Sequence, residues 1–149
     1  MRAAIWVIPY LLLGSVAIAQ DPDPNSIFPG EWWNERCSKL DIQLAAADAD
    51  NRLVSGLFVT GVGSGSGTQF KITGFAAGDM IAFSAALGST GSLTSWSGQH
   101  TIINGTETIV TQWLLAANLS EDADEEKNMW RSLWTGADSF VKQKPSNCP

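Results

Sequence analysis

The chain has 149 residues and a formal net charge of −6 at pH 7, with 9 Lys and Arg against 15 Asp and Glu. Its length is that of one domain with a hydrophobic core of its own. The sequence contains no basic patch, which argues against nucleic acid as a partner. The most acidic run, Glu121–Lys127, is interpreted as a solvated loop.

The first 19 residues have the pattern of a secretory signal peptide. Arg2 gives a positive start, Ile5–Gly14 an apolar centre, and Ala17–Ala19 a small-residue cleavage site. The apolar run is too short for a membrane span. We therefore expect a secreted protein without membrane contact, in which residues 20–149 form a single domain.

A secreted protein can carry disulfide bonds and N-linked glycans. Cys37 and Cys148 are the two cysteines of the mature chain, and they can pair within the chain, pair between chains or stay free. The sequons that begin at Asn104 and Asn118 lie in predicted loops and are candidates for N-glycosylation.

Short β-strands are predicted along the mature chain, because apolar and polar residues alternate with a period of two. The lead-in Asp21–Ser26 contains two prolines, which argue against a helix or a central strand. A short helical turn is expected over Asn128–Leu133. The predicted strands are Gly30–Ile42, Arg52–Thr60, Gln69–Ala76, Met80–Leu87, Leu93–Ile103, Thr106–Leu115 and Ser139–Lys144.

The segments between these strands indicate hairpins. Turns are expected at Ala45–Asn51, Gly78–Asp79, Gly88–Gly91 and, most strongly, Asn104–Gly105. The Gly/Ser segment Gly61–Thr68 is either a plain linker or a lid over a ligand. About eight short antiparallel strands favour an all-β fold, an up-and-down barrel that leaves no exposed edge. A barrel of this size has room for one small ligand.

Tryptophans recur in the second half of the chain, at Trp96, Trp113, Trp130 and Trp134. Trp113 belongs to Ile109–Leu115, whose alternation is typical of a strand with two distinct faces. These rings either pack a core or line one cavity, and their spacing does not decide between the two.

The residue types needed for catalysis are missing or isolated. His100 is the only histidine, and it has no nucleophile pattern near it in the sequence. No Cys/His set has zinc spacing, and no glycine-rich loop leads into a helix to hold phosphate. We therefore expect a binding protein without enzymatic activity, metal or cofactor.

Four motifs, in order along the chain, resemble those of the avidin and streptavidin family. They are Gly30–Ser38 (GEWWNERCS), Ser92–Gln99 (SLTSWSGQ), Thr111–Leu115 (TQWLL), and Trp130 followed by Gly136–Phe140 (GADSF). The resemblance covers essentially the whole mature chain. It implies an eight-stranded barrel that binds biotin, as a homo-oligomer in which a tetramer is favoured and a dimer is the alternative.

The resemblance also implies the role of each biotin-contacting position. Asn34 and Ser38 donate to the ureido carbonyl, and Thr60 and Asp138 accept from the ureido N–H groups. The other positions are Thr94 beside the ring sulfur, Ser92 at the carboxylate tail, the walls Trp96, Trp113 and Leu115, and Trp130, which is lent across a subunit boundary. Each polar residue also has a simpler interpretation, since Asn34 and Asp138 can join the first strand to the last.

Three positions depart from the family pattern. Phe58 stands where a tyrosine usually donates to the ureido carbonyl, and the loss of one buried hydrogen bond costs roughly 1–3 kcal/mol, or about one to two decades of affinity. Leu87 stands where a wall tryptophan is usual, and Cys37 where a glycine is usual. The alternatives are weaker biotin binding or a different small cyclic or apolar ligand. A hydrolase and a lectin-like surface protein have less support.

Overall fold

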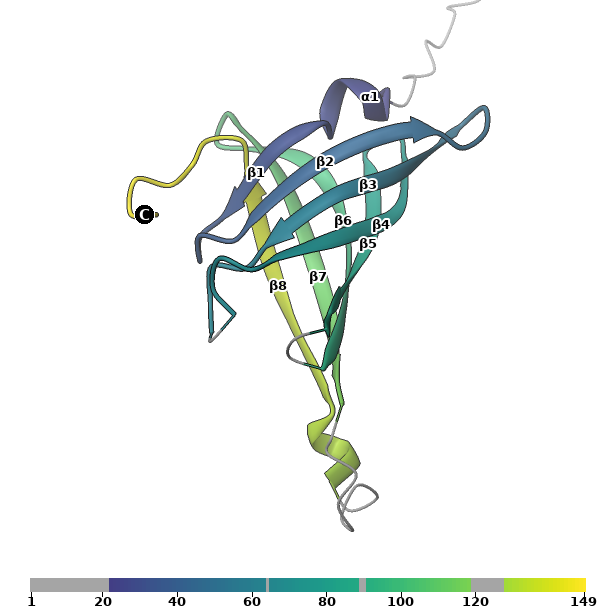
Figure 1. Cartoon of the computed structure of the whole chain (residues 1–149). Coiled ribbons are helices and arrows are strands. Elements are labelled where there is room, and N and C mark those ends of the chain that lie inside the picture. The colour runs from purple at the N-terminus through teal and green to yellow at the C-terminus, as the bar shows by residue number, and fades with distance from the viewer. Residues whose placement is uncertain (1–21, 64, 89–90, 119–127) are drawn as a thin grey trace, which may run out of the picture.

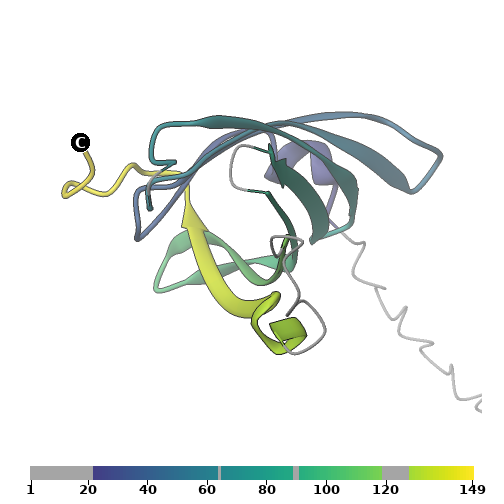
Figure 2. The same cartoon turned by 60° about the horizontal axis from the view of Figure 1, so that its bottom comes forward.

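A computed structural model describes residues 22–63, 65–88, 91–118 and 128–149. Eight antiparallel strands follow one another around a single closed barrel in sequence order (Figures 1 and 2). The expected eight-stranded up-and-down barrel is therefore confirmed. The expected signal peptide and acidic loop lie outside the described residues. Within the described ranges, no helix has the length and hydrophobicity required to cross a membrane.

The strand boundaries are close to the predicted ones in the middle of the chain. The strands are β1 (Gly30–Asn34), β2 (Lys39–Ala46), β3 (Asn51–Val59), β4 (Gln69–Ala77), β5 (Met80–Leu87), β6 (Ser92–Ile103), β7 (Thr106–Ala117) and β8 (Leu133–Val141). The short helices are α1 (Pro24–Ile27) and η2 (Met129–Arg131). The predicted helical turn at residues 128–133 corresponds to η2.

The predicted first strand, Gly30–Ile42, is wrong because a tight turn divides it into β1 and β2. The side-chain Oδ1 of Asn34 accepts from the backbone N–H groups of Arg36 (3.0 Å) and Ser38 (2.8 Å) and so folds the chain back. Cys37 completes the turn with a φ of 63°, in the left-handed region that favours glycine. Period-two alternation continues on both sides of this turn and therefore hides it.

The expectation that the lead-in contains no helix is also wrong. Pro24 begins α1 at a position where a helix needs no backbone N–H donor, so proline is accommodated there. Asp23 caps the helix by accepting from the backbone N–H of Asn25 at 3.0 Å. The helix places Ile27 and Phe28 in the core.

The last strand begins and ends earlier than predicted, since it spans Leu133–Val141 rather than Ser139–Lys144. It pairs with β7 from Ala116 back to Thr108, whereas its pairing with β1 is limited to Asn34 and Trp33. Gly136 is essential to this arrangement, because a side chain there would overlap the indole ring of Trp113 on β7.

The two ends of the barrel differ. At one end lies α1, and the fully buried rings of Phe28 and Trp32 fill the interior beneath it, with Trp32 Nε1 donating to Phe28 O at 2.7 Å. At the opposite end lie the β1–β2 turn, the β3–β4 loop and η2, which follows β7 (Figure 1). Side chains that point inward near this second end line a cavity.

Candidate functional site

A cavity of about 640 Å³ lies inside the barrel at the end opposite α1. Most of the residues expected to contact biotin line it, so the fold brings them together from six strands and two connections. They are Asn34, Ser38, Phe58, Thr60, Leu87, Thr94, Trp96, Trp113, Leu115 and Asp138.

Two expected contact residues are not among those that line the cavity. Ser92 begins β6 and pairs with Leu87, so it lies beside the cavity and is partly buried. Trp130 lies in η2, and 77% of its surface is exposed. Its expected role across a subunit boundary concerns a neighbouring chain and stays a prediction.

Asn34 and Ser38 are oriented as hydrogen-bond donors toward the cavity. Both residues are almost fully buried, and Asn34 uses its side-chain oxygen within the β1–β2 turn. Its amide group Nδ2 donates one hydrogen to Asp138 Oδ1 at 3.1 Å and has a second hydrogen to give. Ser38 Oγ accepts from the backbone N–H of Gly61 at 3.0 Å, which leaves its own hydrogen for a ligand. The pair therefore suits a carbonyl oxygen.

Asp138 lies next to these donors and provides acceptors. Besides Asn34, Trp96 donates to it, from Nε1 to Oδ2 at 3.0 Å. Burial is the main cause that raises the pKa of this carboxyl, and the bonds from Trp96 and Asn34 oppose that effect. Each carboxylate oxygen retains acceptor capacity, so Asp138 both joins the first strand to the last and can receive a ligand N–H. The two interpretations of Asn34 and Asp138 are thus compatible.

Two threonine hydroxyls complete the polar lining. Thr60 Oγ1 donates to Val62 O at 3.2 Å and accepts from the Val62 N–H at 3.3 Å, so it meets a ligand as an acceptor. Thr94 is 3% exposed, and its Oγ1 is one of two buried side-chain polar atoms in the described ranges without a hydrogen-bond partner. A buried hydroxyl needs a partner, so Thr94 Oγ1 is available to a ligand or a water molecule in this cavity.

Aromatic rings form the deeper walls. Trp96 stacks on Phe83 with ring centroids 5.2 Å apart and meets Phe58 at 4.9 Å. Trp113 lies over Gly136, which leaves it no room to shift toward β8. The rings thus hold one another in place and reduce the entropy cost of binding a rigid ligand.

Some lining residues were not predicted from the sequence. Glu35, Arg36 and Val62 come from the two connections at this end of the barrel, and Trp134, Gly136 and Ala137 come from the first half of β8. The available signal was the spacing of Trp134 and Gly136 from Asp138, because residues two apart point to the same face of a strand.

A disulfide joins Cys37 to Cys148, with Cα atoms 5.3 Å apart. Of the three possibilities open from the sequence, the structure has the pairing within the chain. The bond ties the segment after β8 to the turn that carries Asn34 and Ser38. Gly61 packs against the backbone of Arg36 and Cys37 so closely that a side chain at Gly61 would overlap it. The turn is therefore held from two directions.

Both candidate glycosylation positions have exposed asparagines. Asn104 lies in the β6–β7 turn with a φ of 50°, at the end of the barrel that carries α1. Asn118 follows β7, and its sequon extends into residues outside the described ranges. Neither asparagine lines the cavity.

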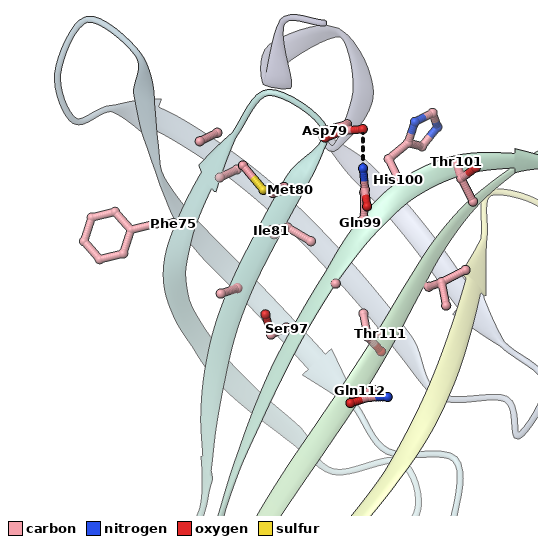
Figure 3. A pocket seen from close by; sticks show the side chains of 15 residues that line it. Phe75, Asp79, Met80, Ile81, Ser97, Gln99, His100, Thr101, Thr111 and Gln112 are labelled. Atoms are coloured by element: carbon pink, nitrogen blue, oxygen red, sulfur yellow. Dashed lines mark hydrogen bonds between the residues drawn. The ribbon is translucent and has the colours of Figure 1, made fainter. Parts of the chain in front are cut away.

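Two hollows lie on the outer side of the barrel. One of about 810 Å³ spans β4 to β7 and includes Phe75 and Met80 (Figure 3). A second of about 600 Å³ adjoins it and extends to β8. Asp79 and Gln99 face one another in the first hollow and are joined by a hydrogen bond of 2.7 Å, so they satisfy each other. The lining also includes His100, whose Nε2 is the second buried side-chain atom without a hydrogen-bond partner in the described ranges.

The fold and the cavity define a small-ligand-binding β-barrel. The chain belongs to the avidin family, whose model matches residues 24–143. Similar solved structures include a rhizavidin–biotin complex at 24% identity, covering 76% of this chain and 98% of that one with a TM-score of 0.61. A short afifavidin–biotin complex is 26% identical, with 75% and 86% covered and a TM-score of 0.56. Xenavidin is 23% identical, with 77% and 96% covered and a TM-score of 0.63.

Proposed function

We propose that this protein is a secreted, non-catalytic biotin-binding protein that sequesters one biotin in the cavity of each barrel. The observation that carries the proposal is the arrangement of donors and acceptors around Asn34, Ser38 and Asp138. A cyclic urea needs donors at its carbonyl and acceptors at its two N–H groups, and this cluster supplies both. Solved relatives in complex with biotin and membership in the avidin family support the same ligand.

Secretion is supported by the N-terminal sequence and by the disulfide. The first 19 residues have the three parts of a signal peptide, with cleavage proposed after Ala19. Disulfides persist in oxidising compartments, so the Cys37–Cys148 bond agrees with an extracellular location. Mass spectrometry of the exported protein tests this, since a mature chain that begins at Gln20 is expected.

Calorimetric titration with biotin tests the proposed ligand. We expect saturation at one biotin per chain, with binding that survives when the sample is diluted to nanomolar concentrations. A titration without heat, together with no displacement of a biotin-competitive dye, would overturn the proposal. In that case Phe58 and Leu87, which depart from the family pattern, favour a second candidate ligand, a different small cyclic or apolar molecule.

Biotin affinity should depend on pH through Asp138. Only the ionised carboxylate offers its full acceptor capacity to a ligand N–H, so binding favours the deprotonated form. Because burial raises the pKa of Asp138, we expect affinity to decline on acidification earlier than an ordinary aspartate would allow, by up to about tenfold per pH unit below that pKa. Titrations between about pH 4 and pH 8 measure this.

The control for this pH dependence is Asp138→Asn. It keeps the size of the side chain, lacks the titrating group, and should bind biotin more weakly with a flatter pH profile. If the parent protein shows a profile as flat as that of the variant, Asp138 does not receive a ligand proton donor.

Phe58→Tyr should tighten biotin binding. Phe58 is 6% exposed and lines the cavity, so the added hydroxyl gives the ureido oxygen one more buried donor. A hydrogen bond of this kind contributes roughly 1–3 kcal/mol, which corresponds to about ten- to a hundredfold in the dissociation constant. Phe75→Tyr is the matched control, because Phe75 is exposed on the outer side of the barrel. Unchanged or weaker binding in Phe58→Tyr would show that the ligand carbonyl lies elsewhere.

We also propose that the protein is a homo-oligomer, a tetramer rather than a dimer. Support comes from the outer side of β4 to β7, where apolar side chains are exposed over neighbouring strands. They are Phe75, Met80, Leu93, Val110 and Leu114. Exposed apolar patches of this kind mark association surfaces in soluble proteins. The exposed ring of Trp130 is then available to a neighbouring chain.

Analytical ultracentrifugation tests the oligomer. Val110→Arg should shift the protein toward smaller species, because a buried arginine without a partner is costly at an interface. Gln43→Arg, on an exposed position of β2, is the control and should leave the mass unchanged. A monomeric parent protein would contradict the proposal.

A further inference from the structure

Trp134 is an exposed ring on the rim of the cavity. It is 60% exposed, whereas Trp96 deeper in the same cavity is 4% exposed. In β8 it lies opposite Leu115 of β7, and Leu115 also lines the cavity. An indole so open to water contributes little to the core, and its apolar face is left uncovered beside the entrance.

The ring is nevertheless held in place. Trp134 Nε1 donates to the backbone carbonyl of Arg131 in η2 at 2.8 Å, which satisfies the only polar atom of the side chain. Next to it, Thr135 Oγ1 donates to Trp113 O at 2.9 Å. The apolar surface of the ring remains available to a ligand. Because the ring is already oriented, contact with it costs little conformational entropy.

The polar groups of the site lie deeper than this ring. Asn34 and Ser38 are 3% and 2% exposed, and Thr94 is 3% exposed. A bound molecule therefore places its polar ring at the bottom of the cavity. A side chain attached to that ring extends toward the entrance and passes the rim. Trp130, four residues earlier, does not line the cavity of its own chain.

We infer that Trp134 is a ligand-contacting residue that covers the aliphatic side chain of bound biotin from within the same subunit. This inference rests on the proposed biotin-binding function and adds one contact to it. According to this inference, the site prefers ligands that have a cyclic urea head and a flexible apolar chain. Trp134 of β8 is the residue that favours the chain.

The test compares Trp134→Leu with the parent protein on two ligands, biotin and an analogue whose side chain is cut back to a methyl group. Leucine keeps an apolar residue in the strand but loses most of the ring surface. We expect biotin to bind Trp134→Leu about tenfold more weakly, with the affinity of the shortened analogue unchanged. The control is Trp33→Leu, a tryptophan on the outer side of β1 that does not line the cavity, and it should bind both ligands as the parent does.

A second readout is fluorine NMR of protein labelled with 5-fluorotryptophan. The resonance that disappears in Trp134→Leu belongs to Trp134, and in the parent it should shift when biotin is added. Equal effects on both ligands, no effect on either, or an unmoved resonance would each overturn the inference while the parent still binds biotin. If the parent binds neither ligand, the proposed function itself fails and this inference fails with it.

Discussion

Asn34→Ala should weaken biotin binding by roughly a hundredfold, as expected for a lost buried donor whose partner atoms are left unsatisfied. The substitution removes the Nδ2 hydrogen offered to the ureido oxygen. It also removes the bond to Asp138, and this leaves a buried carboxylate with one donor fewer. Calorimetric titration gives the dissociation constant directly.

The same residue organises the β1–β2 turn, so the two effects must be separated. Asn34→Asp keeps an acceptor for the N–H groups of Arg36 and Ser38 but has no amide donor. It also brings a second carboxylate against Asp138. We expect this variant to keep the barrel, as judged by circular dichroism, and to lose binding as Asn34→Ala does.

Asn51→Ala provides the control for Asn34. Asn51 lies at the β2–β3 turn at the other end of the barrel, where its side chain bonds to Asp48. Its removal should leave biotin affinity unchanged. Parent-like affinity in both Asn34 variants would show that the ligand head binds elsewhere.

Removal of the disulfide should give the largest change in stability. In the chain-entropy description, a bond across 111 residues restricts the unfolded chain strongly, and loss of a native disulfide typically costs about 2–5 kcal/mol. The double variant Cys37→Ser/Cys148→Ser leaves no free thiol. Its free energy of unfolding should fall by that amount in guanidinium titrations at fixed protein concentration.

Reduction provides an independent measure of the same bond. Dithiothreitol should lower the stability of the parent protein to that of the double variant and have no effect on the variant itself. Because Cys37 precedes Ser38 in the turn of the binding site, we also expect weaker biotin binding in the double variant. If neither reduction nor substitution changes the unfolding transition, the bond does not form in solution.

The barrel was predictable because most of its strands satisfy several local rules at once. β3 to β7 combine period-two alternation with glycine- or asparagine-containing turns, and their predicted bounds agree with the structure within two residues. The predicted boundaries are wrong where the hydrogen bonds of a single side chain determine the backbone conformation. Asn34 builds the β1–β2 turn through its own oxygen, and neither glycine nor proline marks that turn.

The site was predictable as a set but not in its details. The family motifs gave the positions that line the cavity, yet the sequence does not indicate that Ser38 already accepts from Gly61 and so must act as a donor. The family motif distinguished Trp130 from Trp134, but Trp134 was not predicted to line the cavity. Their spacing is the same as that of two neighbours on a helix, and only the early start of β8 puts one ring on the rim and the other outside.

The disulfide also determines how this protein could be attached to other molecules. It holds the last residues beside the turn of Asn34 and Ser38, whereas α1 lies at the far end of the barrel (Figure 1). A partner domain fused after Pro149 would stand next to the entrance and compete for space with large biotinylated cargo. A fusion or surface anchor placed before Pro24 would leave the entrance facing outward, so the amino-terminal side is the better point of immobilisation.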